Sequence, residues 1–251
     1  ISPAALSVSE SSGVASFTVK LGSQPSGDVT VGLDWTATGD ATVSASSLTF
    51  TSANWNVPQT VTVTGVPDLI DEDDKVLTIS TSITASADVL YAMALDVPDV
   101  AVTVTDDDTA GFNITPITLL TQEGGGGSFR VKLTSQPVAD VTLTLTSNNT
   151  AEGLLGPTSS ASLSLTFTAA NWSVFQLVSV TGVDDGYNPD GNQTYTISTV
   201  SGSAGDVKYA ALGDPGVIDV QVTNADNDQP GIVVAAPPQL ATSEDGTSDT
   251  F

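Results

Sequence analysis

Apolar and polar residues alternate with a period of two along many short stretches of the chain. In residues 17–21, 29–35, 60–64 and 100–105, Phe, Val, Leu and Trp occupy alternate positions, with Thr, Lys and other residues between them. This period is typical of β-strands with one buried face, and it indicates antiparallel sheets. Turn-forming residues, such as the Pro-Ser-Gly-Asp stretch at 25–28, separate the strands. The pattern predicts an all-β protein.

The strand pattern occurs twice and begins a third time. Residues 16–25 match 128–137, residues 48–55 match 165–172, and another copy begins near Gly231. About seven strands in about 110 residues predict an immunoglobulin-like Greek-key β-sandwich. Helix should be limited to one short turn within 85–95, and the chain reads as a segment of a longer polypeptide. We therefore predict an elongated array of two complete sandwich repeats and the N-terminal strands of a third, with the limits 1–110, 111–229 and 230–251.

The charge balance excludes several kinds of function. The chain has 5 Lys and Arg, 29 Asp and Glu, a formal net charge of −24, and neither Cys nor His. Nucleic acid and anionic membrane surfaces are poor partners for such a chain, because both attract basic surfaces. A zinc site of thiolates or imidazoles and a Ser-His-Asp nucleophile lack their residues. No apolar run is long enough to insert in a membrane. Oxygen-ligand chemistry remains.

The acidic residues gather after the first strand, in the loop before the penultimate strand, and after the last strand of each repeat. These residues are Glu10, Asp68, Asp71, Glu72, Asp73, Asp74, Asp106, Asp107 and Asp108 in the first repeat, and Glu123, Asp184, Asp185, Asp190, Asp226 and Asp228 with Asn192 and Asn227 in the second. We expect the three places to converge at one pole of each sandwich. Two carboxylates 4 Å apart repel by about 4 kcal/mol at an effective dielectric near 20. The loops either stay spread in solvent or bind a cation, and Ca²⁺, with about six to eight oxygen ligands, suits them better than octahedral Mg²⁺.

The order of these motifs resembles the Calx-β domain. The motifs are Glu-Ser-Ser-Gly at 10–13, the acidic loop at 68–74 before Leu-Thr-Ile, and Val-Thr-Val-Thr-Asp-Asp-Asp at 102–108. The resemblance implies a seven-stranded sandwich with Ca²⁺ sites at the pole that faces the next domain. The ligands that it implies in the first repeat are Glu10, Asp68, Asp74, Asp106, Asp107 and Asp108, with Asp71 and Asp73 as extras. Those that it implies in the second repeat are Glu123, Asp185, Asp190, Asn192, Asp226 and Asp228. Asn192 stands opposite Asp74 and Asn227 opposite Asp107, so the second site should hold fewer ions or bind more weakly.

The acids at the repeat junctions, together with this resemblance to the tandem repeats of large bacterial surface proteins, suggest a non-catalytic extracellular structural module. We expect a calcium-rigidified stalk of a bacterial surface adhesin or of a secreted matrix protein. Its partners would be neighbouring repeats of the same chain, other copies of itself, or ligands on a host or cell surface. One alternative is a filament subunit that adds the strand at Val233–Thr242 to another chain.

A second alternative is a glycan-binding module, with Trp55 and Trp172 as stacking platforms. Both Trp residues follow an Asn in the same frame, so we interpret them instead as anchors of a loop at the start of a strand. The run of glycines at 124–127 lacks the Lys of a phosphate loop and is interpreted as the turn between the first two strands.

Overall fold

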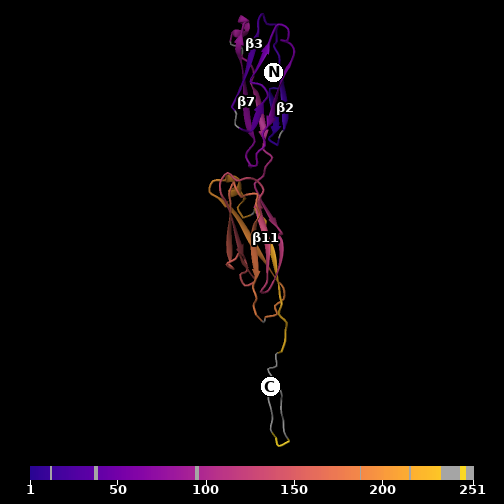
Figure 1. Cartoon of the computed structure of the whole chain (residues 1–251), viewed down its shortest axis with the longest axis vertical. Helices are drawn as coiled ribbons and strands as arrows, with labels where there is room; N and C mark the ends of the chain where they lie inside the picture. Colours follow the sequence, from indigo (N-terminus) through magenta and orange to yellow (C-terminus); the bar gives the residue numbers. More distant parts are fainter. Residues whose placement is uncertain are drawn as a thin grey trace.

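A computed structural model describes residues 1–11, 13–36, 39–93, 96–186, 188–214, 216–232 and 244–246. Figure 1 shows two β-sandwiches, one after the other along the longest axis of the molecule. The described residues contain only two short helices, so the predicted all-β fold is confirmed. None of these helices has the length and apolar character needed to cross a membrane.

The first sandwich consists of two facing sheets. One sheet has the order β1-β8-β7-β3-β5 and the other the order β2-β6-β4. The elements are β1 (Ala5–Ser9), β2 (Val14–Val19), β3 (Val29–Trp35), β4 (Ala41–Val43), β5 (Ser47–Phe50), β6 (Gln59–Gly65), β7 (Lys75–Ser86), α1 (Val89–Ala92) and β8 (Val100–Thr105). The helix α1 lies within the stretch expected to form a short turn.

The second sandwich repeats this arrangement. Its sheets have the orders β10-β17-β16-β12-β14 and β13-β15-β11-β9. The elements are β9 (Phe112–Thr115), β10 (Thr118–Gln122), β11 (Gly126–Leu133), β12 (Val141–Ser147), β13 (Gly153–Leu155), β14 (Ser162–Phe167), β15 (Gln176–Gly182), β16 (Gln193–Ser203), α2 (Val207–Leu212) and β17 (Val220–Ala225).

Alternate residues of the strands build the two cores. On β2, Phe17 and Val19 are 0% and 3% exposed, whereas Thr18 between them lies on the outer face. The buried residues form two separate clusters, one from Val8 to Val104 and one from Ala110 to Val222. Each sandwich therefore has its own hydrophobic core, and the short segment between Val104 and Ala110 joins them.

Among the described residues, each sandwich has more strands than the predicted seven. Each sandwich has an additional short strand at the edge of one sheet, and the first strand of the second sandwich is divided in two. The edge strands β4 and β13 have three residues each. The first strand of the second sandwich is divided, with β9 paired to β11 and β10 paired to β17. In the first sandwich, an isolated bridge from Ser2 to Thr18 takes the place of β9. The first strand of each repeat thus contacts both sheets.

Candidate metal centres

The strand pairing brings the three acidic segments of the first sandwich to one pole. β1 runs parallel to β8, with Ser9 opposite Thr105, so Glu10 and Asp106 leave the sheet side by side. β7 runs antiparallel to β8 and begins at Lys75, opposite Val104. The loop before β7 therefore arrives at the same end of the sheet. The convergence expected from the sequence follows from this topology. We call this group the first acidic pole: Glu10, Asp68, Asp71, Asp73, Asp74, Asp106, Asp107 and Asp108.

Glu10, Asp68 and Asp108 form the tightest group at this pole. One carboxylate oxygen from each lies within 4.8 Å of the other two. Glu10 is only 4% exposed, and among the described residues its Oε1 has no hydrogen-bond partner. A buried carboxylate without a partner is unfavourable, because it has lost its hydration. Three converging carboxylates, one of them from the buried Glu10, match the ligands that Ca²⁺ takes, so the residues fit this ion.

Two carboxylates of the first acidic pole, those of Glu10 and Asp108, hold their protons more tightly than ordinary acids. Burial raises the pKa of Glu10 from 4.5 to about 7, and a hydrogen bond with Asp106 and the charge of Asp106 add to the effect. Burial and the neighbouring aspartates also raise the pKa of Asp108. The cause in both cases is that a second or third negative charge is hard to hold in a desolvated cluster. A bound divalent cation would remove this penalty.

Other acids predicted as ligands hold the loop before β7 to the end of β8. The Asp106 N–H donates to Asp74 Oδ1 at 3.1 Å, and the Glu72 N–H donates to Asp106 Oδ2 at 2.9 Å. The Asp108 N–H donates to Asp106 Oδ1 at 3.3 Å. Asp107 is exposed to solvent. Asp74 and Asp106 therefore position the backbone around the group of Glu10, Asp68 and Asp108.

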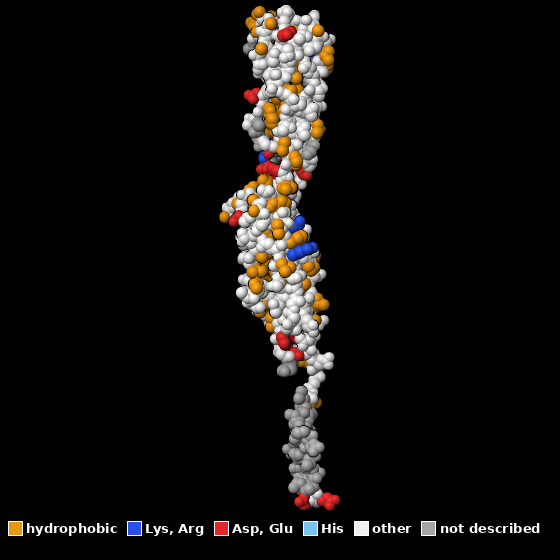
Figure 2. Space-filling view, viewed as in Figure 1, with side chains coloured by type: hydrophobic (Ala, Val, Ile, Leu, Met, Phe, Trp, Pro, Cys, Tyr) orange, Lys and Arg blue, Asp and Glu red, His pale blue; other side chains and the backbone are white. Residues whose placement is uncertain are grey.

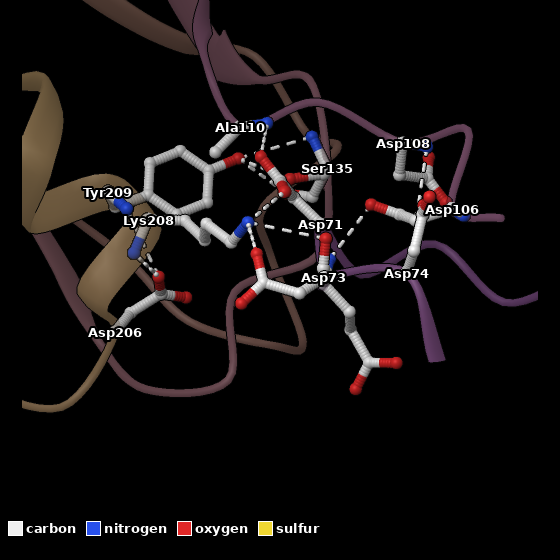
Figure 3. A network of polar contacts seen from close by, with 11 residues as sticks. Asp71, Asp73, Asp74, Asp106, Asp108, Ala110, Ser135, Asp206, Lys208 and Tyr209 are labelled. Carbon is white, nitrogen blue, oxygen red and sulfur yellow. Dashed lines mark hydrogen bonds and ion pairs between the residues drawn. The ribbon is translucent and has the colours of Figure 1, made fainter. Parts of the chain in front are cut away.

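Asp71 and Asp73, the two extra candidates, contact a lysine from the second sandwich. Lys208 extends from α2, and its Nζ lies 3.1 Å from Asp71 Oδ1 and 2.8 Å from Asp73 Oδ1 (Figure 3). Lys208 Nζ also donates to the Glu72 carbonyl at 3.2 Å. Asp71 Oδ2 accepts a hydrogen bond of 2.7 Å from the Ala110 N–H. These two carboxylates thus connect the two sandwiches.

Sequence reasoning missed Lys208. The sequence offered a clue, because the chain has only 5 basic residues and Lys208 is one of them. Lys208 follows Asp206, the N-cap of α2, and Val207, the first residue of the helix. The matching position after Asp88 and Val89 in the first sandwich is Leu90. Further contacts at the joint are a hydrogen bond of 2.7 Å from Thr134 Oγ1 to the Thr109 carbonyl and one from the Gln136 N–H to the Leu69 carbonyl. The first acidic pole therefore lies at the joint between the sandwiches.

The second sandwich has an equivalent pole, the second acidic pole: Glu123, Asp184, Asp185, Asp190, Asn192, Asp226 and Asp228. Two groups of close oxygens share Glu123, one with Asp184 and Asp228 and one with Asp185 and Asp190. The sequence-based ligand set included Asp185 but not Asp184. Among the described residues, Asp228 Oδ2 is buried without a hydrogen-bond partner. Two overlapping oxygen groups give this pole at least as many potential ligands as the first.

The hydrogen bonds around the second acidic pole repeat those of the first. The Asp226 N–H donates to Asn192 Oδ1 at 3.1 Å, and the Gly191 N–H donates to Asp226 Oδ2 at 2.8 Å. Asn192 thus occupies the place of Asp74 with one charge fewer. The Asn227 N–H lowers the pKa of Glu123, but burial and the charges of neighbouring aspartates outweigh it and raise that pKa overall. Burial is also the main cause that raises the pKa of Asp228.

The remaining candidates have structural roles. Trp55 and Trp172 pack against the cores, and their carbonyls accept hydrogen bonds from the N–H groups of Leu21 and Leu133. These contacts agree with their interpretation as loop anchors. Gly124, at a φ of 68°, lies in the turn between β10 and β11. The strand expected at Val233–Thr242 lies outside the described residues.

No family model and no curated protein matches this sequence. Among solved structures, CBD12 from CALX1.2 matches with 15% identity over 89% of this chain and 97% of that chain, at a TM-score of 0.40. The calcium binding domain CBD12 of CALX1.1 matches with 19% identity over 79% and 76% of the two chains, at a TM-score of 0.33. WR4, an MSP family member of C. elegans, matches with 15% identity over 45% and 97%, at a TM-score of 0.31. These scores are too low to assign a function, so membership in the Calx-β family stays a prediction.

Proposed function

We propose that this chain is a non-catalytic structural module whose joints are stiffened by Ca²⁺. The observation that carries the proposal is that buried Glu10, whose Oε1 has no hydrogen-bond partner among the described residues, offers a carboxylate oxygen within 4.8 Å of oxygens from Asp68 and Asp108. Calcium bound by these oxygens would connect the ends of β1 and β8 to the loop before β7. The same loop provides Asp71 and Asp73, which contact Lys208 of the second sandwich. Ordering the loop therefore orders the joint.

The physical reason is electrostatic. Without a cation, the acids of each pole repel one another, and the repulsion falls when the loop that carries them moves away from the other acids. With Ca²⁺, the loop is fixed, and the aspartates that contact Lys208 are held in place. The module would then act as a stiff spacer whose length depends on calcium.

The setting that we propose is extracellular, as a stalk segment of a bacterial surface adhesin or of a secreted matrix protein. Partly exposed carboxylate sites in extracellular modules bind Ca²⁺ with dissociation constants of about 10⁻⁴–10⁻³ M, so they fill only where calcium is abundant. The partners that this function needs are neighbouring repeats of the same chain.

Small-angle scattering and thermal melting test this function, each with Ca²⁺, with Mg²⁺ and with a chelator. Calcium at about a hundred times its dissociation constant should stabilise the fold by about 2.7 kcal/mol, which corresponds to a rise in Tm of about 10 °C. It should also narrow the distribution of distances between the two sandwiches. The control is the variant Glu10→Gln with Glu123→Gln, in which both effects should disappear. An unchanged Tm and an unchanged maximum dimension on calcium addition would contradict the proposal.

A further inference from the structure

The outer face of the sheet β13-β15-β11-β9 carries a group of basic and apolar side chains. Arg130 and Lys132 alternate with buried residues on β11 and therefore point outward. The guanidinium carbon of Arg130 lies 4.3 Å from the centre of the Phe175 ring, and Lys132 Nζ lies 5.1 Å from it. Leu177, opposite Arg130 in the register, is 70% exposed, and Val174 is 60% exposed. We call this group the basic face: Arg130, Lys132, Val174, Phe175 and Leu177.

Among the described residues, neither cation of the basic face forms an ion pair. The chain has 29 acidic residues for 5 basic ones, and its ion pairs among the described residues use only Lys75 and Lys208. The four strands of this sheet contain neither Asp nor Glu. Figure 2 shows Lys and Arg side chains beside hydrophobic ones on the second sandwich. Two like charges therefore share one aromatic ring, and no carboxylate of the described residues pairs with either of them.

The fold does not require the complete basic face, because the first sandwich has other residues at the positions of Arg130, Phe175 and Leu177. Thr18 pairs with Thr60 in the register of β2 and β6, which matches the pairing of Arg130 with Leu177. Pro58 stands before β6 where Phe175 stands before β15. The two sandwiches otherwise share their sheet orders. Lys132 and Val174 have counterparts in Lys20 and Val57, so the second sandwich adds Arg130, Phe175 and Leu177 to this surface.

We propose that the basic face is a docking surface for an acidic, apolar segment of another protein. An arginine fork binds a carboxylate through two parallel hydrogen bonds, and Lys132 provides a second positive charge beside it. A carboxylate placed there also relieves the repulsion between the two cations. Arg and Phe are enriched at protein interfaces, where a few such residues provide most of the binding energy.

The exposed aliphatic side chains favour a protein over an anionic polysaccharide. Leu177 lies opposite Arg130 in the register, and both Leu177 and Val174 expose apolar surface. Aliphatic side chains of a partner would bury this surface and gain from its removal from water. A polysaccharide offers hydroxyl groups, which such residues cannot satisfy. The positive charges attract an acidic protein segment and an anionic polysaccharide alike. The exposed apolar side chains favour the protein segment.

The experiment uses the whole chain and a labelled peptide of alternating Glu and Val residues. The variant that tests the proposal is Arg130→Thr with Leu177→Thr, which introduces the residues found at Thr18 and Thr60 of the first sandwich. The matched control is Lys20→Thr, which removes one cation from the other repeat. Fluorescence anisotropy gives the affinity, and the melting temperature of each variant checks its fold. Arg130→Gln, which keeps the length and polarity of the side chain, is the second variant.

The wild type and Lys20→Thr should bind the peptide equally, and the double variant should bind at least about tenfold more weakly. Arg130→Gln should show most of this loss at an unchanged melting temperature. Binding should weaken as NaCl rises and should be the same with a chelator as with Ca²⁺. Equal affinity of the double variant and the wild type would overturn the proposal, as would no binding of the peptide to the wild type. Binding of polygalacturonate at this face in place of the peptide would overturn the choice of a protein partner.

Discussion

Glu10→Gln tests the electrostatics of the first acidic pole most sharply. Raising the pKa of Glu10 from 4.5 to about 7 corresponds to about 3 kcal/mol that the ionised side chain costs the metal-free fold. Gln has nearly the same shape and no charge. We therefore expect the variant to be more stable than the wild type by about 2–3 kcal/mol at pH 8 in a chelator.

The difference in stability between Glu10→Gln and the wild type depends on pH. Because the folded state binds the Glu10 proton more tightly than the unfolded state, the wild type should lose stability as pH rises from about 4.5 to about 7. Below about pH 4 the side chain is protonated in both the folded and the unfolded state, so the two proteins should be nearly equal. Calcium reverses the order at pH 8, because the carboxylate binds it more tightly than the neutral amide of Gln does.

Urea unfolding measures this difference. Trp35 and Trp55 lie in the first sandwich, and Trp172→Phe removes the signal of the second. At a slope of about 1–3 kcal/mol per molar urea, the midpoint in chelator should move up by about 1 M or more. A variant less stable than the wild type at pH 8 in chelator would refute the account of a strained, desolvated carboxylate.

Three further substitutions test the joint, the second acidic pole and the stability of the second sandwich. Lys208→Met should widen the distribution of distances between the sandwiches in electron-paramagnetic distance measurements without calcium, whereas Lys20→Met should not; equal distributions would show that Lys208 does not hold the joint. Asn192→Asp should raise the calcium affinity of the second pole and lower its metal-free stability, and calorimetry showing neither change would contradict the role of this position. Asp206→Ala should destabilise the second sandwich by about 1–3 kcal/mol in urea, because the buried side chain caps α2 through the N–H groups of Lys208 and Tyr209; a loss below about 0.5 kcal/mol would contradict this.

The strands and their buried faces could be predicted from the sequence because each depends on local periodicity. Phe17 and Val19 point into the core because alternate residues of a strand lie on the same face, and the apolar face of β2 is the buried one. The acidic poles required one further fact, the parallel pairing of β1 with β8. That pairing joins residues nearly a whole repeat apart, and no local pattern encodes it.

Two parts of the site show where sequence reasoning was insufficient, the acidic pair at 184–185 and Lys208. Asp184 and Asp185 are neighbours, and the path of the loop decides which of them joins Asp228 and which joins Asp190. Lys208 is on a short helix of the second sandwich, and its contact with Asp71 depends on how the two sandwiches meet. Both facts depend on loop geometry and domain placement, which the alternation of strands does not determine.

Calcium titration by calorimetry of the metal-free wild type, of Glu10→Gln and of Glu123→Gln tests the central claim most directly. The account predicts that the wild type binds Ca²⁺ at both poles, that each variant loses the ions of one pole, and that Mg²⁺ competes weakly. Absence of calcium binding by the wild type at millimolar concentration, or equal binding by all three proteins, would contradict it.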